Sequence, residues 1–385
     1  MKHKKDRIEI FYETGIQMKS SIFMTINSFQ GLPPVKQLLS NISKDYQLTC
    51  IQCNIQNFEN FFDQRNIINY SILNFKSSQD FNSQNITHKI VKYIWLPFYF
   101  FRSYFLKRSS NVTIYAIDLY CIFIAILAKR KSTKIVYLQY EMIEPNGLNK
   151  FDKYLLRFIQ KKSEKIDLII TPEINRTKYL KKIFHKSNDH SFLTIPNTNN
   201  FNKTNKSIAI RGAKTIVTHV GSIGLNHYIK LYLEAITKMD SHKYEFRFIG
   251  LLSDEVVELI SSYQKSNILY IDQVLHSDLP KYYLETDIGV ILYKDVSLNH
   301  RFCAPNKLYE YWSFGIPVLG HHLPGLQSVF TETFLGELID MSIPTNIIEA
   351  ISKLQLIDNR EIIADFFQSH LRLDNYFNGL NLVLN

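Results

Sequence analysis

The stretch at residues 303–325, CAPNKLYEYWSFGIPVLGHHLPG, is the feature that most constrains how this chain folds. Pro305 suits the start of a helix, and Gly315 suits its end because glycine adopts the left-handed C-terminal conformation without steric cost. Residues 316–319 then indicate a short buried strand, which a second glycine turn follows. The stretch therefore predicts a short helix followed directly by a buried strand.

The predicted helix carries Lys307 and Glu310 on one face, because they lie three residues apart. A helix N-terminus offers free backbone N–H groups that suit a phosphate, and Lys307 adds a point charge for that phosphate. Glu310 lies one turn further in, where its carboxylate can accept two hydrogen bonds from vicinal hydroxyls. A phosphate beside a diol describes a nucleotide, whereas the alternative is a capped surface helix with a weak ion pair.

This stretch resembles the C-terminal signature of GT-B glycosyltransferases of the family 4 type, in their Pro-x-Lys-x-x-Glu-Tyr branch. The residues in register are Pro305, Lys307, Glu310, Tyr311, Gly315, Pro317 and Val318. The resemblance implies an α/β protein of the GT-B fold, with two Rossmann-like, doubly wound parallel-sheet domains that face a cleft. It also implies a nucleoside diphosphate sugar as donor, with Glu310 and Lys307 as the catalytic residues.

The length of the chain predicts two domains, because 385 residues are about twice the length of a typical domain. Residues 198–207, TNNFNKTNKS, are almost free of apolar side chains, so we interpret them as an interdomain linker. We expect an N-terminal acceptor-binding domain at residues 1–205 and a C-terminal nucleotide-sugar-binding domain at residues 206–361. By resemblance to the tails of GT-B proteins, residues 362–385 are expected to pack back on the N-terminal domain.

Strands alternate with helices along both predicted domains, which indicates parallel, doubly wound sheets. The predicted strands lie at residues 21–28, 47–52, 112–118, 134–138, 167–172, 216–224, 246–249, 268–271 and 288–292. Ligands of such sheets bind beyond the carboxyl ends of the strands. This rule places Asp118, Tyr140 and Glu141 at the cleft, where we expect them on the acceptor side.

The resemblance also assigns a donor site to positions along the whole chain. Its donor-binding residues are Gly31, Gly221, Ser222, Gly250, Asn306, Lys307 and Glu310. Two positions depart from the family pattern: Phe302 stands where many members carry a second glutamate, and Ser222 stands where they usually carry an arginine. The sequence then favours a diphosphate held by backbone N–H groups and Lys307, with no metal ion and no cofactor.

The net charge of +10 is divided unevenly, which indicates an anionic partner for the first half of the chain. Up to residue 206, 31 Lys and Arg stand against 15 acidic residues (+16), and beyond it 14 stand against 20 (−6). Residues 86–107 lie in the basic half and mix aromatic with cationic side chains, as interfacial membrane helices do. The equally weighted alternative is a helix packed on the sheet. We predict an anionic membrane surface as the partner and no nucleic acid.

These features predict a cytoplasmic enzyme that is peripheral on the inner face of the plasma membrane. We expect no secretory signal, because residues 1–15 have no apolar core behind their charges. The expected reaction moves a hexose from a UDP- or GDP-sugar to a lipid-linked glycan of surface polysaccharide synthesis, with retention of configuration. Two alternatives stay open: a nucleotide-sugar epimerase of GT-B fold, and a non-catalytic GT-B partner subunit, which the departures at Phe302 and Ser222 motivate.

Overall fold

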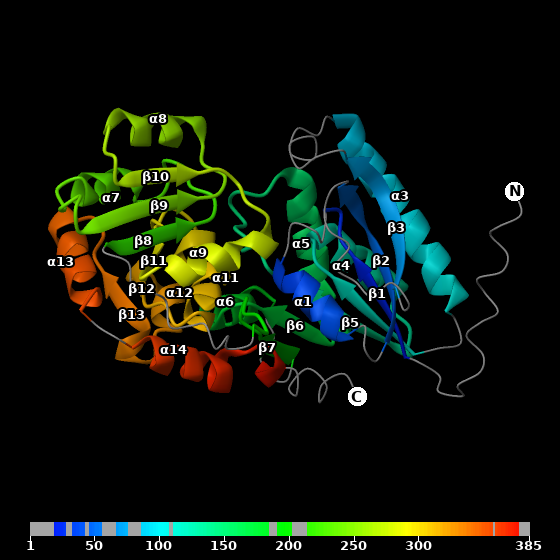
Figure 1. Cartoon of the computed structure of the whole chain (residues 1–385). Helices are drawn as coiled ribbons and strands as arrows, with labels where there is room; N and C mark the ends of the chain where they lie inside the picture. The colour runs from blue at the N-terminus through cyan, green and yellow to red at the C-terminus, as the bar shows by residue number, and fades with distance from the viewer. Residues whose placement is uncertain are drawn as a thin grey trace, which may run out of the picture. The chain divides into compact units, whose positions relative to one another are not determined.

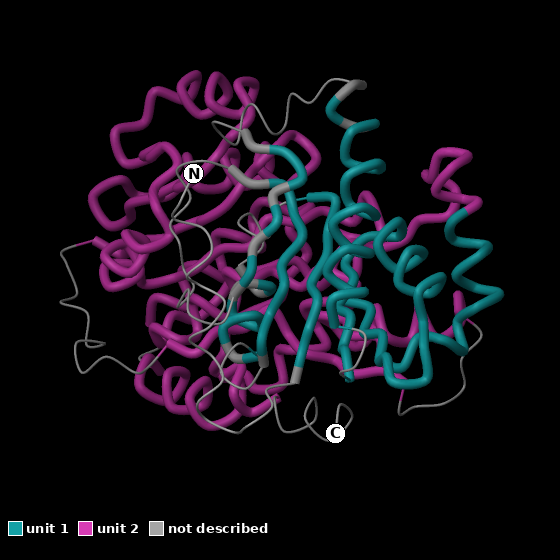
Figure 2. Tube along the Cα trace, turned by 90° about the vertical axis from the view of Figure 1, so that its right-hand side faces the viewer, with its two compact units in different colours: residues 1–138, 155–167 teal, residues 139–154, 168–385 magenta. Residues whose placement is uncertain are grey.

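A computed structural model describes the chain at residues 19–27, 33–42, 46–55, 67–75, 86–107, 111–184, 191–201, 214–356 and 359–376. The chain forms two compact units (Figure 2). Unit 1 consists of residues 1–138 and 155–167, and unit 2 consists of residues 139–154 and 168–385. The predicted division into domains at residues 1–205 and 206–361 stays a prediction.

Unit 1 contains parallel strands that neighbour one another in the order β3-β2-β1-β4-β5 (Figure 1). Its elements are β1 (Lys19–Met24), α1 (Pro33–Ile42), β2 (Tyr46–Ile55), β3 (Ile67–Phe75), α3 (Ile86–Leu106), β4 (Val112–Ala116), α4 (Leu119–Ala128), β5 (Thr133–Leu138) and the 3₁₀ turn η3 (Ser163–Lys165). Helix α5 (Lys150–Lys161) has residues in both units.

The centre of this sheet is apolar on both faces, as parallel sheets require. Every residue of β4 is buried, and the rings of Phe23 and Tyr115 stack across β1 and β4 with centroids 4.2 Å apart. The sequence does not predict β3, whose apolar pattern is interrupted by Asn69 and Ser71. This strand pairs with β2 and has no other neighbour among the strands that the structure describes, so it tolerates polar residues.

Helix α3 has one buried and one exposed apolar face. Leu96, Phe100 and Tyr104 are buried where α3 packs against β1, β2 and β3. Their spacing of four residues places them on one side of the helix. Large apolar side chains elsewhere on the helix are exposed: Ile90, Ile94, Trp95, Phe98, Phe105 and Leu106. The segment therefore packs on the sheet, as one alternative predicts, and still presents the apolar surface on which the other alternative depends.

Unit 2 contains the paired strands β6 and β7 and a six-stranded parallel sheet in the order β10-β9-β8-β11-β12-β13. Its strands are β6 (Leu168–Thr171), β7 (Phe192–Thr194), β8 (Thr215–Val220), β9 (Tyr244–Ile249), β10 (Ile268–Ile271), β11 (Ile288–Ile291), β12 (Val318–His321) and β13 (Gly336–Ile339). Its helices are α6 (Ile174–Ile183), α7 (Ile229–Ile236), α8 (Asp254–Ser262), η5 (His276–Asp278), α9 (Leu279–Glu285), α10 (Leu298–Arg301), α11 (Asn306–Ser313), α12 (Pro324–Gln327), η6 (Thr333–Leu335), α13 (Pro344–Leu354), α14 (Arg360–Phe366) and η7 (Phe367–Leu371).

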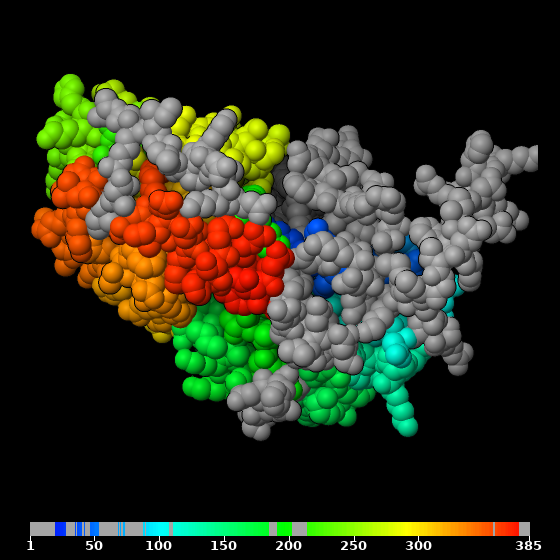
Figure 3. Space-filling model, turned by 60° about the horizontal axis from the view of Figure 1, so that its bottom comes forward, coloured from blue at the N-terminus to red at the C-terminus, as the bar shows by residue number. Residues whose placement is uncertain are grey.

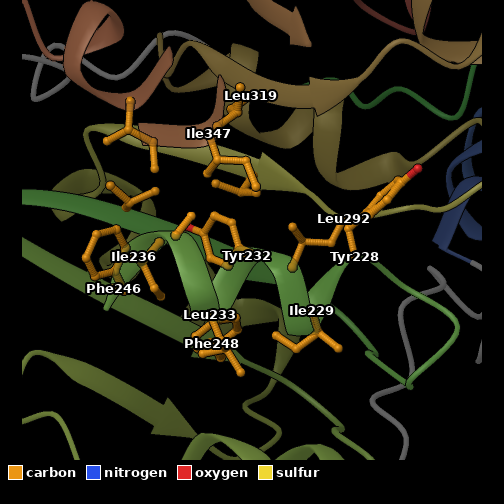
Figure 4. Packing of buried hydrophobic residues seen from close by; sticks show 14 of the residues in the cluster. Tyr228, Ile229, Tyr232, Leu233, Ile236, Phe246, Phe248, Leu292, Leu319 and Ile347 are labelled. Atoms are coloured by element: carbon orange, nitrogen blue, oxygen red, sulfur yellow. The ribbon is translucent and has the colours of Figure 1, made fainter. Parts of the chain in front are cut away.

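The strand order of the large sheet reverses between β8 and β11, which makes their carboxyl ends the expected place for a ligand. The core beneath that edge is built from α7, β9 and α13. In Figure 4, Tyr232 and Leu233 of α7 lie among Phe246 and Phe248 of β9, while Ile347 comes from α13. All five side chains are almost inaccessible to solvent, so the strand ends rest on a rigid base.

The C-terminal residues of unit 2 run back along residues 198–201. Leu373 N donates to the carbonyl of Asn199 at 3.1 Å, and Gln368 Nε2 donates to the carbonyl of Phe201 at 2.9 Å. Figure 3 shows this C-terminal segment (red) at the surface of the molecule. The contacts join the end of the chain to the first residues of the predicted linker. The packing of residues 377–385 lies outside the described part.

Candidate functional site

Helix α11 begins and ends where the sequence predicts. Pro305 is its N-cap residue in extended conformation (φ −71°, ψ 122°), and Gly315 lies just past its end at φ 72°. A Cβ atom at Gly315 would lie 2.3 Å from the carbonyl oxygen of Arg360, so both the backbone angle and the packing require glycine. The strand predicted at residues 316–319 is present as β12, shifted by two residues.

Two buried aromatic side chains fasten α11 to strand β8 and to the turn η6. Tyr311 Oη donates to the carbonyl of Thr218 at 2.9 Å, and Trp312 Nε1 donates to the carbonyl of Leu335 at 2.9 Å. Both rings are fully buried, so each brings a large apolar area and a satisfied polar atom into the core. The helix is thereby held against β8 and η6, which fixes the direction of the remaining face.

That remaining face directs Glu310 into a cluster of hydrogen-bond donors. The Glu310 side chain is 4% exposed, yet four side chains donate to its two carboxylate oxygens. Oε2 accepts from Tyr283 Oη at 2.5 Å and from Lys307 Nζ at 2.8 Å. Oε1 accepts from Asn306 Nδ2 at 3.2 Å and from His276 Nε2 at 3.3 Å. Oε1 therefore has the longer and weaker pair of contacts, which an incoming hydroxyl can replace.

The cluster keeps the carboxyl group of Glu310 ionised. Burial alone would raise its pKa, but the charge of Lys307 and the hydrogen bonds from His276 and Lys307 outweigh burial and lower the pKa to about 2. The pKa of the Tyr283 phenol changes in the opposite direction, because burial and the adjoining carboxylate raise it. The phenol therefore keeps its proton and stays a hydrogen-bond donor. Glu310 is therefore an acceptor of hydrogen bonds at every physiological pH.

Acid is expected to weaken unit 2 through Glu310. A carboxyl group with a folded-state pKa of about 2 and an ordinary value of 4.5 contributes its full stability above pH 4.5 and loses it toward pH 2. The stability advantage of wild type over Glu310→Gln should shrink by about 2 kcal/mol between about pH 5 and pH 3. Trp312 fluorescence in a Trp95→Phe background follows unit 2, because the chain has two tryptophans. A difference that stays constant across this range contradicts the expectation.

Gly221 and Gly250 bring the carboxyl ends of β8 and β9 into contact. Both have left-handed backbone angles (φ 135° and 133°), and a Cβ at Gly250 would lie 2.6 Å from the carbonyl oxygen of Gly221. Ser222 follows with an exposed side chain. Gly221, Ser222 and Gly250 therefore share one edge of the sheet, and their part in donor binding stays a prediction. Gly31 lies outside the described residues.

The three predicted acceptor-side residues have different surroundings. Asp118, in unit 1, is the N-cap residue of α4 and accepts from Thr25 Oγ1 at 2.5 Å and from Ile26 N at 2.8 Å. Burial raises the pKa of this carboxyl group. These contacts make Asp118 a brace for the backbone that follows β1. Its part in acceptor binding stays a prediction.

Tyr140 and Glu141 lie in unit 2 beside two residues that the sequence does not single out. The guanidinium of Arg176 donates to the carbonyl of Tyr140, and Asn299 Nδ2 donates to Glu141 Oε2 at 2.7 Å. Burial raises the pKa of the Tyr140 phenol, so this group stays protonated. Like the partners Tyr283 and His276 of Glu310, Arg176 and Asn299 come from distant segments, and no local spacing in the sequence indicates them.

Two further features bear on the chemistry available to the site. Within the ranges that the structure describes, no cluster of His, Cys, Asp and Glu side chains could hold a metal ion. Across the same ranges, each helix is too short or too polar to cross a membrane.

Comparison with known proteins relates this architecture to glycosyl transfer. Residues 200–364 match the family model described as Glycosyl transferases group 1. The crystal structure of Anabaena Alr3699/HepE in complex with UDP and glucose is similar at a TM-score of 0.69, with 11% identity over 96% of this chain and 99% of that chain. The structure of WaaG, a glycosyltransferase involved in lipopolysaccharide biosynthesis, is similar at a TM-score of 0.63. The identity is 12%, and the match covers 94% of this chain and 98% of that chain.

A curated relative from Klebsiella pneumoniae, described as an uncharacterized 41.2 kDa protein in the cps region, is 22% identical over 173 residues. That match spans 44% of this chain and 46% of the relative, so it covers less than half of either protein. The structural matches show that the chain has the GT-B fold, with parallel sheets and interleaved helices. The family match supports glycosyl transfer as its activity.

Proposed function

We propose that this chain transfers a hexose from a UDP- or GDP-sugar to a glycan acceptor. The observation that carries the proposal is the buried, ionised carboxylate of Glu310 beside Lys307 in the first turn of α11. An ionised carboxylate suits the two hydroxyls of a ribose, and an ammonium group suits the adjoining diphosphate. The family match over residues 200–364 and the UDP in the Anabaena structure support this assignment.

The leaving group of the proposed reaction is a nucleoside diphosphate, whose negative charge grows as its bond to the sugar breaks. Pro305 provides no side-chain cap for α11, so the first N–H groups of the helix are available to this charge. Lys307 adds a full positive charge at the same place. We propose that these groups stabilise the leaving diphosphate without a metal ion, and that the anomeric configuration is retained.

The proposed acceptor is a lipid-linked glycan at the cytoplasmic face of an anionic membrane. The exposed apolar face of α3 in unit 1 supports this part of the proposal, because it gathers two aromatic anchors, Trp95 and Phe98, with Phe105. Arg102 is exposed on the same helix, and the guanidinium of Arg130 lies 5.3 Å from the ring centre of Phe105. Aromatic and cationic side chains together suit the headgroup region of a bilayer.

Replacing Trp95, Phe98 and Phe105 by serine is expected to weaken binding to anionic vesicles by at least about tenfold, because apolar area inserted at the headgroups is lost. Co-sedimentation with phosphatidylglycerol and phosphatidylcholine vesicles at low and high salt measures the change. The matched control replaces three exposed apolar residues of unit 2, namely Ile343, Leu356 and Ile362. A triple variant that is folded by circular dichroism and binds as tightly as wild type contradicts a membrane role for α3.

A panel of UDP- and GDP-sugars tests the proposed reaction. Thermal shift ranks the donors that bind, and the best donors are then incubated with a lipid extract while transfer and hydrolysis are measured. Transfer to lipid-linked material supports the proposal. Interconversion of the donor sugar without an acceptor would indicate an epimerase, and a donor that binds but is never consumed would indicate a non-catalytic partner subunit. Absence of nucleotide binding contradicts the site itself.

A further inference from the structure

Arg176 of α6 is a buried cation held by backbone carbonyls. The residue is 5% exposed, and its guanidinium donates in three directions. Nε donates to the carbonyl of Phe302 at 2.6 Å, Nη2 donates to that of Asn299 at 3.3 Å, and Nη1 donates to that of Tyr140. Three segments that are far apart in the sequence therefore meet at one side chain.

The start of α6 is itself fixed, which gives Arg176 a rigid support. Glu173 is the N-cap residue, and its Oε2 accepts from the backbone N–H of Arg176 at 3.0 Å. Its Oε1 accepts from Ser328 Oγ at 2.8 Å, and Asn175 Nδ2 donates to the carbonyl of Pro324 at 3.2 Å. The first turn of α6 is thus fastened to the segment that contains α12.

The backbone that leads into α11 is confined between these two elements. On one side it meets Arg176 at the Phe302 carbonyl, and on the other it meets Gly325 so closely that a Cβ there would lie 2.5 Å from the N of Cys303. One residue further on, Asn197 Nδ2 donates to the carbonyl of Ala304 at 2.8 Å. Side chains thus hold two of the three carbonyls at residues 302–304, directly before the helix that carries Lys307.

The charge of Arg176 is also unusual for a buried group. Burial lowers its pKa, and the nearby carboxylates of Glu141 and Glu173 oppose that shift. Among the residues that the structure describes, no carboxylate forms an ion pair with this guanidinium, so carbonyl oxygens are its hydrogen-bond partners. A guanidinium remains protonated in such surroundings, and its planar fork fixes the directions of its partners.

We propose that Arg176 is a positioning residue for sugar transfer: by holding the carbonyls of Tyr140, Asn299 and Phe302, it sets the backbone that delivers α11 to the donor. The inference rests on the proposed function of α11. In this role Arg176 does not contact the donor. A misplacement of reacting groups by about 1 Å can lower a rate about a hundredfold, so a positioning residue has a measurable effect on turnover.

Arg176→Ala and Arg176→Lys test this role. Both are expected to lower kcat about a hundredfold while UDP affinity changes far less, because Arg176 shares no hydrogen-bond partner with Glu310. A lysine cannot donate in three fixed directions, so it should not replace the arginine. Guanidinium ion added to Arg176→Ala should restore part of the turnover. The matched control is Arg301→Ala, which removes an arginine that pairs with Asp295 at the surface. It should keep wild-type turnover.

Hydrogen exchange separates this inference from the proposed reaction. Amides of residues 299–308 should exchange faster in Arg176→Ala and Arg176→Lys than in Arg301→Ala, and guanidinium should restore their protection in Arg176→Ala. Unchanged exchange in both Arg176 variants overturns the inference, whether or not the wild-type protein transfers sugar. The inference is also overturned if both variants lose thermal stability and their UDP affinity falls by the same factor as kcat, with no rescue by guanidinium. That outcome indicates a purely structural role. Absence of transfer by the wild type, with exchange as expected, would contradict the proposed function alone.

Discussion

Replacing Glu310 with alanine is expected to abolish turnover and to weaken donor binding by about 2–4 kcal/mol, because hydrogen bonds to an ionised group are the strong kind. At room temperature this free energy corresponds to roughly a 30- to 1,000-fold increase in Kd. The loss should be as large for uridine as for UDP, because the carboxylate is assigned to the ribose hydroxyls. The variant also leaves Lys307 and Tyr283 without the acceptor that they share.

Isothermal titration with uridine, UMP and UDP measures these affinities. Glu285→Ala is the matched control, because the Glu285 side chain is 59% exposed and pairs with Arg247 in the same unit. It should bind all three ligands as wild type does. Circular dichroism establishes that the Glu310 variant is folded. Near-normal donor affinity and rate in that folded variant would remove Glu310 from the nucleotide site.

Lys307→Ala is expected to weaken UDP binding by about 1.5–3 kcal/mol, the usual contribution of a hydrogen bond to a charged group. The loss should be large for UDP and small for uridine, because Lys307 is assigned to the diphosphate. Lys307→Arg should recover only part of the affinity, since a compact ammonium and a planar guanidinium place their donors differently. The ammonium of Lys307 lies 2.8 Å from Glu310 Oε2 and is therefore beside the position assigned to the ribose.

The competing view is that Lys307 serves Glu310 alone. In that case its removal would alter the carboxylate and reduce uridine and UDP binding by the same factor. Lys353→Ala provides the control, because Lys353 also pairs with a glutamate, Glu337, at the surface of the same unit. Equal losses for uridine and UDP in Lys307→Ala would contradict the diphosphate assignment and leave the ribose assignment of Glu310 intact.

Local signals in the sequence were sufficient to predict the helix and strand of the proposed donor site. Pro305, Gly315 and the apolar run after it predict α11 and β12, because helix ends and turns depend on backbone preferences of a few neighbouring residues. The spacing of Lys307 and Glu310 likewise predicts their contact, since it follows from helix geometry alone. The alternation of strands and helices predicts parallel sheets, because each helix connects two neighbouring parallel strands. The structural matches show the GT-B fold.

Tertiary structure alone decided what surrounds those residues. Tyr283 and His276 reach Glu310 from 27 and 34 residues away, and Arg176 reaches Phe302 from 126 residues away. Such partners depend on how strands are ordered and helices packed, and no spacing along the chain encodes that arrangement. The aromatic segment in α3 shows the same limit: its composition fits a membrane or a core, and the direction in which the sheet lies decides which side chains are buried. Local backbone preference acts over a few residues, whereas burial and side-chain partnership are properties of the assembled fold.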